Sequence, residues 1–151
     1  MSEMIWKDRV AVVTGAGGTL CSVIAKHLAK KGMKVVLVGR TKEKLDPVAD
    51  AIQTAGGVCR VEPGDVTDEA RMTGIADRVK SEWGCCRILV NGAGGNNIKA
   101  MSTLTKFDRR ELDHTLPEGE RGFADIDLAA FESVLKINTI GTILPYKQVT
   151  L

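Results

Sequence analysis

Short runs of β-branched residues alternate along the chain with segments in which apolar residues recur at helical spacing. The apolar runs at residues 9–15, 34–39, 58–63 and 87–94 predict four strands. The run at 9–15 is continuous and ends in glycine, as expected for a strand buried on both faces of a sheet. Three helices are predicted between these strands, with apolar stripes formed by Leu20, Val23, Ile24 and Leu28, by Leu45, Val48, Ala49 and Ile52, and by Met72, Ile75, Ala76, Val79 and Trp83.

Residues at the predicted helix ends agree with this order. Gly32 ends the first helix, Thr41 is a plausible N-cap of the second, and the glycines at 56–57 close it. Asp68 and Glu69 suit the positive end of the third helix. Strands that alternate with helices favour parallel pairing through right-handed crossovers. The expected fold class is therefore α/β, a Rossmann-type three-layer α/β/α arrangement with a parallel sheet.

The pattern changes after the fourth predicted strand. Residues 95–126 are polar and rich in charge, and this stretch is longer than an ordinary connection, so it is either functional or disordered. Helical periodicity returns with Leu128, Phe131, Val134, Leu135, Asn138 and Thr142, in a helix that we expect Pro145 to interrupt. On this stripe Asn138 would be a buried amide that needs partners.

Composition places the chain among soluble globular proteins. Its 151 residues suffice for one domain, 1–151, and 44% are hydrophobic and 26% charged. A net charge of +2 with interspersed signs argues against nucleic acid or a membrane surface as a partner. The first ten residues carry Glu3 and Asp8, unlike a signal peptide, so we expect a cytoplasmic protein.

The four cysteines, Cys21, Cys59, Cys85 and Cys86, match no zinc-ligand spacing. Reduced thiols packed as small hydrophobic groups are favoured over redox or metal roles. No metal site is expected.

A glycine-rich turn follows the first predicted strand, in the stretch VVTGAGGTLC at residues 12–21. The fingerprint G-x-G-x-x-G fits Gly15 and Gly17 but meets Leu20 at its third glycine. The spacing T-G-x-x-x-G-x-G fits Thr14 and Gly15, then meets Thr19 and Cys21. Gly15, Gly17 and Gly18 still leave the turn feasible. The Thr19 hydroxyl could donate a hydrogen bond to a phosphate. Cys21 is small enough that a slight shift of the helix against the strand would accommodate its side chain. Because the turn opens the first helix, phosphate binding is favoured over a purely structural turn.

The end of the second predicted strand bears on the choice of cofactor. A carboxylate there would accept hydrogen bonds from the ribose of NAD, but the sequence has Arg40. An arginine can pair with a 2′-phosphate, so NADP(H) is favoured and NAD(H) remains possible. The alternative is a solvated surface arginine.

Four ordered motifs together resemble the short-chain dehydrogenases/reductases: TGAGGTLC, GDVTD at 64–68, NGAG at 91–94 and KINTIGT at 136–142. The similarity covers essentially the whole chain. The stretch after NGAGGN and the segment FADIDLAAFESVLKINTIGTILP resemble the D-mannonate oxidoreductase (fructuronate reductase) branch. The resemblance implies NAD(P)-dependent hydride transfer between D-mannonate and D-fructuronate, a sugar-acid substrate and a homo-oligomer.

The resemblance also implies roles for individual residues. Gly15, Gly18, Thr19 and Leu20 would form the pyrophosphate turn, and Arg40 would meet the adenosine ribose or its phosphate. Asp65 and Val66 would bracket the adenine, while Asn91, Ala93 and Gly94 would steady the middle of the cofactor. Asn138 would be the active-site asparagine. The simpler alternatives are that Asp65 only starts a helix and that Asn138 is satisfied by backbone groups. The candidate cofactor-binding residues are thus Thr14, Gly15, Gly17, Gly18, Thr19, Leu20, Arg40, Asp65, Val66, Asn91, Ala93 and Gly94, with Asn138 as candidate catalytic residue.

The chain departs from the family pattern at its C-terminal side. The family's serine and its Tyr-x-x-x-Lys pair lie further downstream, and Tyr146 is followed four residues later by Thr150 rather than lysine. We therefore expect the N-terminal half of such a domain, inactive by itself. In this interpretation the basic residues of the polar stretch, Lys99, Lys106, Arg109, Arg110 and Arg121, would close over an anionic substrate, although a solvated loop explains them more simply. A non-catalytic dinucleotide-binding module and a structural remnant are the alternative functions.

Overall fold

A computed structural model describes residues 5–149, so Glu3 and Thr150 lie outside the described residues. Four parallel strands form one sheet in the order β3-β2-β1-β4. They are β1 (Val10–Thr14), β2 (Lys34–Gly39), β3 (Val58–Pro63) and β4 (Cys86–Val90). The four predicted strands are confirmed, but β4 ends earlier than expected, and residues 91–97 leave the sheet as irregular chain.

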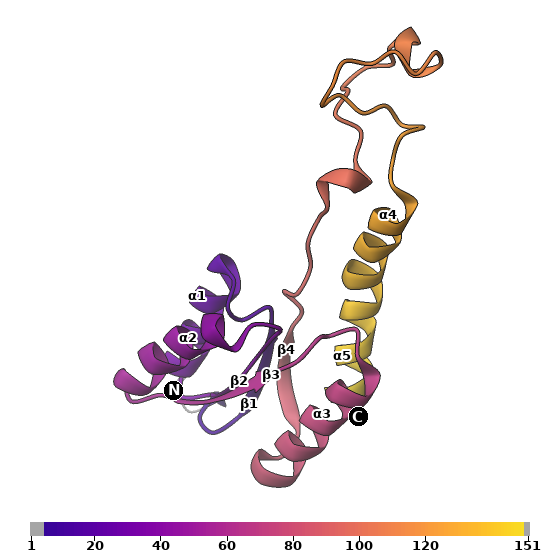
Figure 1. The fold of residues 1–151 in the computed structure, drawn as a ribbon. Coiled ribbons are helices and arrows are strands. Elements are labelled where there is room, and N and C mark those ends of the chain that lie inside the picture. Colours follow the sequence, from indigo (N-terminus) through magenta and orange to yellow (C-terminus); the bar gives the residue numbers. More distant parts are fainter. Residues whose placement is uncertain (1–4, 150–151) are drawn as a thin grey trace.

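Helices cover both faces of this sheet (Figure 1). On one face lie α1 (Thr19–Lys30) and α2 (Lys42–Thr54), and on the other lie α3 (Glu69–Trp83) and α5 (Gly141–Val149). The helix α4 (Leu128–Leu135) joins α5 through a π-helical turn, η4 (Lys136–Ile140). The predicted three-layer Rossmann-type architecture is confirmed.

The alternation of side chains along β1 divides the core in two. Ala11 and Val13 pack against α1 and α2, whereas Val10 and Val12 pack against α3 and α5. All four side chains are at most 2% exposed, because a strand in the middle of a parallel sheet is covered on both faces. The predicted stripes of α2 and α3 are buried, except that Trp83 at the end of α3 is only partly buried. The Asp68 side chain caps α3 by accepting from the Arg71 amide at 3.0 Å.

The predicted stripe of α1 is wrong for Leu20 and Val23, whereas Ile24 and Leu28 are half-buried and Leu28 packs against the core. Leu20 is 72% exposed and Val23 58% exposed, and the buried residues of the helix are Cys21, Ala25 and Ala29. Small side chains allow the helix to approach the sheet closely, so side-chain size decides the buried face here rather than hydrophobicity.

The last helical region also differs from expectation. Pro145 does not interrupt the helix: it is buried within α5, which continues to Val149. Pro145 has no amide hydrogen to donate within the helix. Leu144 and Val149 of α5 nevertheless lie in the core, and α5 packs against α3. In α4, Phe131 and Leu135 are exposed and only Ala130 is buried, so the predicted apolar stripe faces outward.

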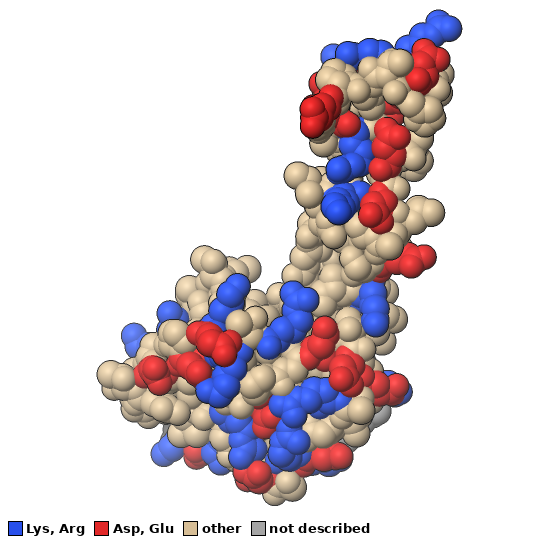
Figure 2. All heavy atoms as spheres, viewed as in Figure 1, with Lys and Arg blue, Asp and Glu red and all other residues tan. Residues whose placement is uncertain are grey.

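Residues 95–126 form an extended arm that projects away from the sheet, together with the start of α4 (Figure 1). The arm is held by local hydrogen bonds, such as the Thr103 amide to the Arg121 carbonyl at 3.0 Å, and contains two short 3-10 turns, η2 (Ile98–Ala100) and η3 (Arg109–Glu111). Figure 2 shows charges of both signs interspersed over the domain and the arm. None of the helices in residues 5–149 is long and apolar enough to cross a membrane.

Candidate functional site

The turn that follows β1 is tight and depends on glycine. Gly15 has a φ of +64°, a conformation that side chains with a Cβ rarely adopt. The Gly18 amide donates to the Gly15 carbonyl at 2.9 Å, and the Ala16 amide donates to the Val38 carbonyl at 3.1 Å. The chain therefore reverses at the carboxyl end of β1 and enters α1 within a few residues.

Backbone segments approach this turn too closely for side chains. A Cβ at Gly15 would lie 2.6 Å from the Gly92 carbonyl oxygen, and one at Gly17 would lie 2.8 Å from Lys44 Cβ. These clashes explain why glycine occupies both positions and leave backbone groups as the surface of the turn.

The N-terminus of α1 lies at the same place and has no side-chain cap. Gly18 is the N-cap residue, and the first turn contains no acidic residue. The amides of a first helical turn lack partners within the helix and carry the positive end of the helix dipole. This arrangement suits a phosphate or pyrophosphate group.

A cavity of about 290 Å³ opens between this turn, the end of β2 and the end of β4, near the lower limit of about 300 Å³ for ligand pockets. Seven predicted site residues line it: Gly15, Gly17, Gly18, Arg40, Val66, Ala93 and Gly94. It is also lined by seven residues that sequence reasoning did not select: Gly39, Thr41, Lys44, Leu45, Gly64, Gly92 and Ile137. Of these, Lys44 could have been found from its place in the first turn of the helix after Arg40.

The charged side chains that line the cavity are Arg40 and Lys44, both exposed. Asp65 does not line it, but accepts hydrogen bonds from the Thr67 amide and hydroxyl, each at 2.8 Å. Burial alone would raise the pKa of Asp65, but these hydrogen bonds, with the charges of Arg40 and Lys136, bring the pKa below its usual value. Asp65 is therefore a carboxylate at neutral pH, within the electrostatic reach of Arg40.

Thr14 acts beneath the cavity rather than in its wall. Its hydroxyl donates to the Val90 carbonyl at 3.4 Å and accepts from the amides of Gly92 and Ala93, each at 3.1 Å. This fully buried side chain ties the end of β1 to the chain that leaves β4. Asn91, just beyond β4, points elsewhere and donates to the Thr142 carbonyl at 3.3 Å.

Asn138 lies in η4 and is exposed, so the expectation of a buried amide is wrong. It nevertheless has backbone partners: Nδ2 donates to the carbonyls of Gly95 at 2.7 Å and Val134 at 2.8 Å. The Gly95 amide donates to its Oδ1 at 3.4 Å. Asn138 thus joins the helix to the segment that forms one side of the cavity.

The remaining predicted residues lie outside the wall of the cavity. Thr19 and Leu20 are exposed in the first turn of α1 and do not line the cavity. The basic residues of the arm do not close over it, because the arm projects away (Figure 1). Arg110 instead forms an ion pair with Asp108 at 2.6 Å, and Arg121 donates to the Ile98 carbonyl at 2.6 Å.

All four cysteines are free thiols. Burial raises the pKa of Cys21, Cys59 and Cys86, which favours the neutral thiol. Cys85 is exposed, contrary to the expectation that all four are packed as hydrophobic groups. Within residues 5–149, no group of three or more His, Cys, Asp or Glu side chains could hold a metal ion.

A parallel sheet whose first strand runs through a glycine turn into an uncapped helix defines a Rossmann-type α/β domain. A family model described as short chain dehydrogenase matches residues 9–150. The chain therefore belongs to the short-chain dehydrogenase family.

Two curated relatives are oxidoreductases of uncharacterised activity. One, from Haemophilus influenzae, is 34% identical over 139 residues, which are 92% of this chain and 47% of that protein. The other, UxuB from Bacillus subtilis, is 34% identical over 136 residues, or 90% of this chain and 46% of that protein. The chain spans about half the length of these relatives.

Solved structures of oxidoreductases are also similar to this chain, which again spans about half of their length. A candidate D-mannonate oxidoreductase from Haemophilus influenzae with bound NAD matches with a TM-score of 0.86 and 32% identity, over 95% of this chain and 49% of that one. A metagenomic short-chain oxidoreductase in complex with NADP matches with a TM-score of 0.69 and 27% identity, over 94% of this chain and 55% of that one.

Proposed function

We propose that this chain is the dinucleotide-binding half of a cytoplasmic NADP(H)-dependent short-chain oxidoreductase that interconverts D-mannonate and D-fructuronate. A dinucleotide site is supported above all by the cavity at the carboxyl ends of β1, β2 and β4. Glycines line this cavity, and the uncapped N-terminus of α1 lies beside it. The NAD and NADP bound to its structural relatives support the same class of cofactor.

The residues present fit such a cofactor. The amides at the start of α1 would bind the pyrophosphate, beside Gly15, Gly17 and Gly18 in the cavity wall. Val66 would pack beside the adenine, with the Asp65 carboxylate next to it. Ala93 and Gly94 would contact the middle of the cofactor. The bound nicotinamide would supply or accept the hydride in the redox step.

Arg40 and Lys44 support a preference for NADP(H). Both line the cavity, one at the end of β2 and one in the first turn of α2. Two cations favour the additional charge of a 2′-phosphate, and an arginine can bind it with two parallel hydrogen bonds. NAD(H) remains the other candidate, because the Haemophilus influenzae structure contains NAD.

Calorimetric titration of the purified chain with NADPH and NADH tests both parts of this proposal. Lys44→Ala is expected to weaken NADPH binding by about tenfold, which is about 1.4 kcal/mol, and to leave NADH binding nearly unchanged. Lys42→Ala is the matched control, because Lys42 lies on the same helix but pairs with Asp46 at 2.7 Å and does not line the cavity. A folded chain that binds neither dinucleotide would refute the cofactor site, and equal losses for both nucleotides would refute the 2′-phosphate role.

The sugar-acid substrate rests on similarity to the candidate D-mannonate oxidoreductase and on the sequence motifs. Asn138 would take part in the active site, held in place by its hydrogen bonds to Gly95. The family's serine, tyrosine and lysine are not in this sequence at the motif spacing, so we expect the 151-residue chain alone to be inactive. Oxidation of NADPH by D-fructuronate, measured for this chain and for a protein of its relatives' full length, tests substrate and inactivity together.

A non-catalytic dinucleotide-binding module is the alternative function, favoured if the longer protein binds the nucleotide without turnover.

We also propose self-association into a homo-oligomer. The support is that five apolar side chains in α4, η4 and α5 are exposed: Leu128, Phe131, Leu135, Ile140 and Ile143. Light scattering across a concentration series tests it, and a monomer at every concentration would refute it.

A further inference from the structure

Cys21 stands where the family spacing has its third glycine, and the structure shows where room for its side chain is found. The thiol is 6% exposed and belongs to the core cluster on the α1 face of the sheet. Gly92 lies opposite, just after β4. A Cβ built on Gly92 would collide with Cys21 Sγ well inside contact distance.

Only the sulfur atom causes this collision. Cys21 Cβ would lie 3.5 Å from the added Cβ, which is an ordinary contact. The remaining close neighbour is the Thr14 carbonyl oxygen at 3.0 Å, a tight contact that needs a small adjustment. Gly92 has no positive φ, so its backbone conformation alone does not require glycine. The space for a side chain at 92 is filled by the thiol of Cys21.

Gly92 and Cys21 both lie close to the cavity, although Cys21 does not line it. Gly92 lines it directly, and its amide is fixed by the Thr14 hydroxyl at 3.1 Å. Cys21 lies in the first turn of α1, whose amides face the proposed phosphate position. The contact between them therefore sets how far the start of α1 stands from the end of β4.

We propose that Cys21 and Gly92 form a size-matched pair of positioning residues. The pair sets the separation between the first turn of α1 and the chain just after β4, and thereby the position at which the dinucleotide binds. The proposal rests on the proposed function for the identity of the bound molecule. On this proposal, the side chain at 21 is accommodated because the residue opposite it, Gly92, has none.

A double-mutant cycle tests the pair. The variants Cys21→Ala, Gly92→Ala and Cys21→Ala/Gly92→Ala are compared with the unaltered chain by thermal unfolding without ligand and by calorimetric titration with NADPH. The double variant moves one heavy atom from position 21 to position 92, so the space is filled from the other side. Gly74→Ala, on α3 away from the cavity, controls for the general effect of replacing glycine in a folded chain.

Gly92→Ala is expected to lower the Tm by about 3–6 °C and to weaken NADPH binding by about tenfold. Cys21→Ala alone has a smaller effect on both, and the double variant recovers most of the loss in Tm and in affinity. The recovery is incomplete because the contact with the Thr14 carbonyl remains. If Gly92→Ala does not fold, a folded double variant supports the pairing and an unfolded one overturns it.

The other outcomes are distinguishable. Equal losses in Gly92→Ala and in the double variant would overturn the proposal, because the strain would then come from Thr14. Recovery of Tm with unchanged affinity in all variants would overturn the positioning role and leave only a packing contact. If the unaltered, folded chain binds no dinucleotide, the proposed function fails and the positioning role falls with it. In that case the thermal cycle still shows whether the two side chains compete for one space.

Discussion

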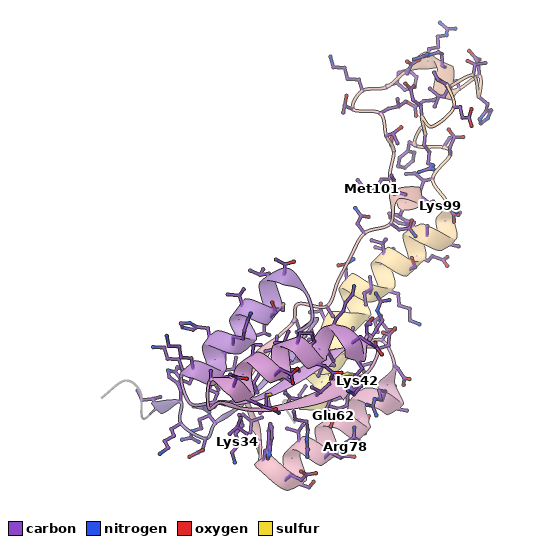
Figure 3. All side chains as sticks on the ribbon, turned by 60° about the vertical axis from the view of Figure 1, so that its left-hand side comes forward. Lys34, Lys42, Glu62, Arg78, Lys99 and Met101 are labelled. Carbon is purple, nitrogen blue, oxygen red and sulfur yellow. The ribbon has the colours of Figure 1, made fainter. Side chains whose placement is uncertain are left out.

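Replacement of Arg78 by alanine would leave a buried carboxylate with a single, longer ion pair. Glu62 lies on β3 with its side chain only 9% exposed, and it accepts from Arg78 Nη2 at 2.7 Å and Nε at 3.3 Å. Arg71 is the second partner, at 3.5 Å. Figure 3 shows Glu62 and Arg78 side by side, between the edge of the sheet and α3.

The expected loss follows from the burial of the two partners. Breaking a fully buried ion pair by removing one partner costs about 3–5 kcal/mol, because it leaves a charge without compensation. Here the Arg78 side chain is 42% exposed, water can reach the vacated space, and Arg71 remains. We therefore expect Arg78→Ala to lower the free energy of unfolding by about 1–2 kcal/mol.

Urea denaturation followed by circular dichroism measures this loss, with Lys42→Ala as the matched control. The Lys42–Asp46 pair has the same 2.7 Å distance, but its side chains are 60% and 41% exposed, so no measurable change is expected. The double variant Arg78→Ala/Glu62→Gln should regain part of the lost stability, because it also removes the buried charge. Equal effects of Arg78→Ala and Lys42→Ala would refute the reasoning that burial of the carboxylate decides the value of the pair.

Three further predictions concern the site. Gly15→Ala should destabilise the chain by at least about 2 kcal/mol in thermal denaturation, whereas Gly56→Ala, also at positive φ but with open space around it, should cost about 1 kcal/mol. The lowered pKa of Asp65 stabilises the fold above its usual pKa of 3.8, and this contribution is lost as the pH falls through the folded-state pKa. Asp65→Asn should therefore flatten the dependence of Tm on pH in that acidic range. Asn138→Ala should accelerate amide hydrogen exchange around Gly95 with little change in Tm, because the hydrogen bonds it removes are exposed.

Much of the fold was predictable because buried parallel strands and amphipathic helices have strong local patterns. The β-branched runs mark β1 and β2, and the stripe from Leu45 to Ile52 is the buried face of α2. The same reasoning failed for α1, because the buried side of that helix carries small residues where it approaches the sheet closely. Of the four larger apolar residues in the predicted stripe, Leu20 and Val23 are exposed, and Ile24 and Leu28 are half-buried.

Part of the candidate site could be predicted from local sequence, and part depends on contacts between residues far apart in the chain. The glycine turn and Arg40 could be found from their positions after strands, since the ends of parallel strands meet at one edge of a sheet. The approach of Gly92 to Cys21 depends on contact between residues far apart in the sequence, which no local pattern contains. A degenerate fingerprint therefore does not by itself indicate a lost site: close packing at this turn needs one residue without a side chain at the contact, and either wall can supply it. In this chain the glycine lies on the β4 side, so Cys21 agrees with an intact turn.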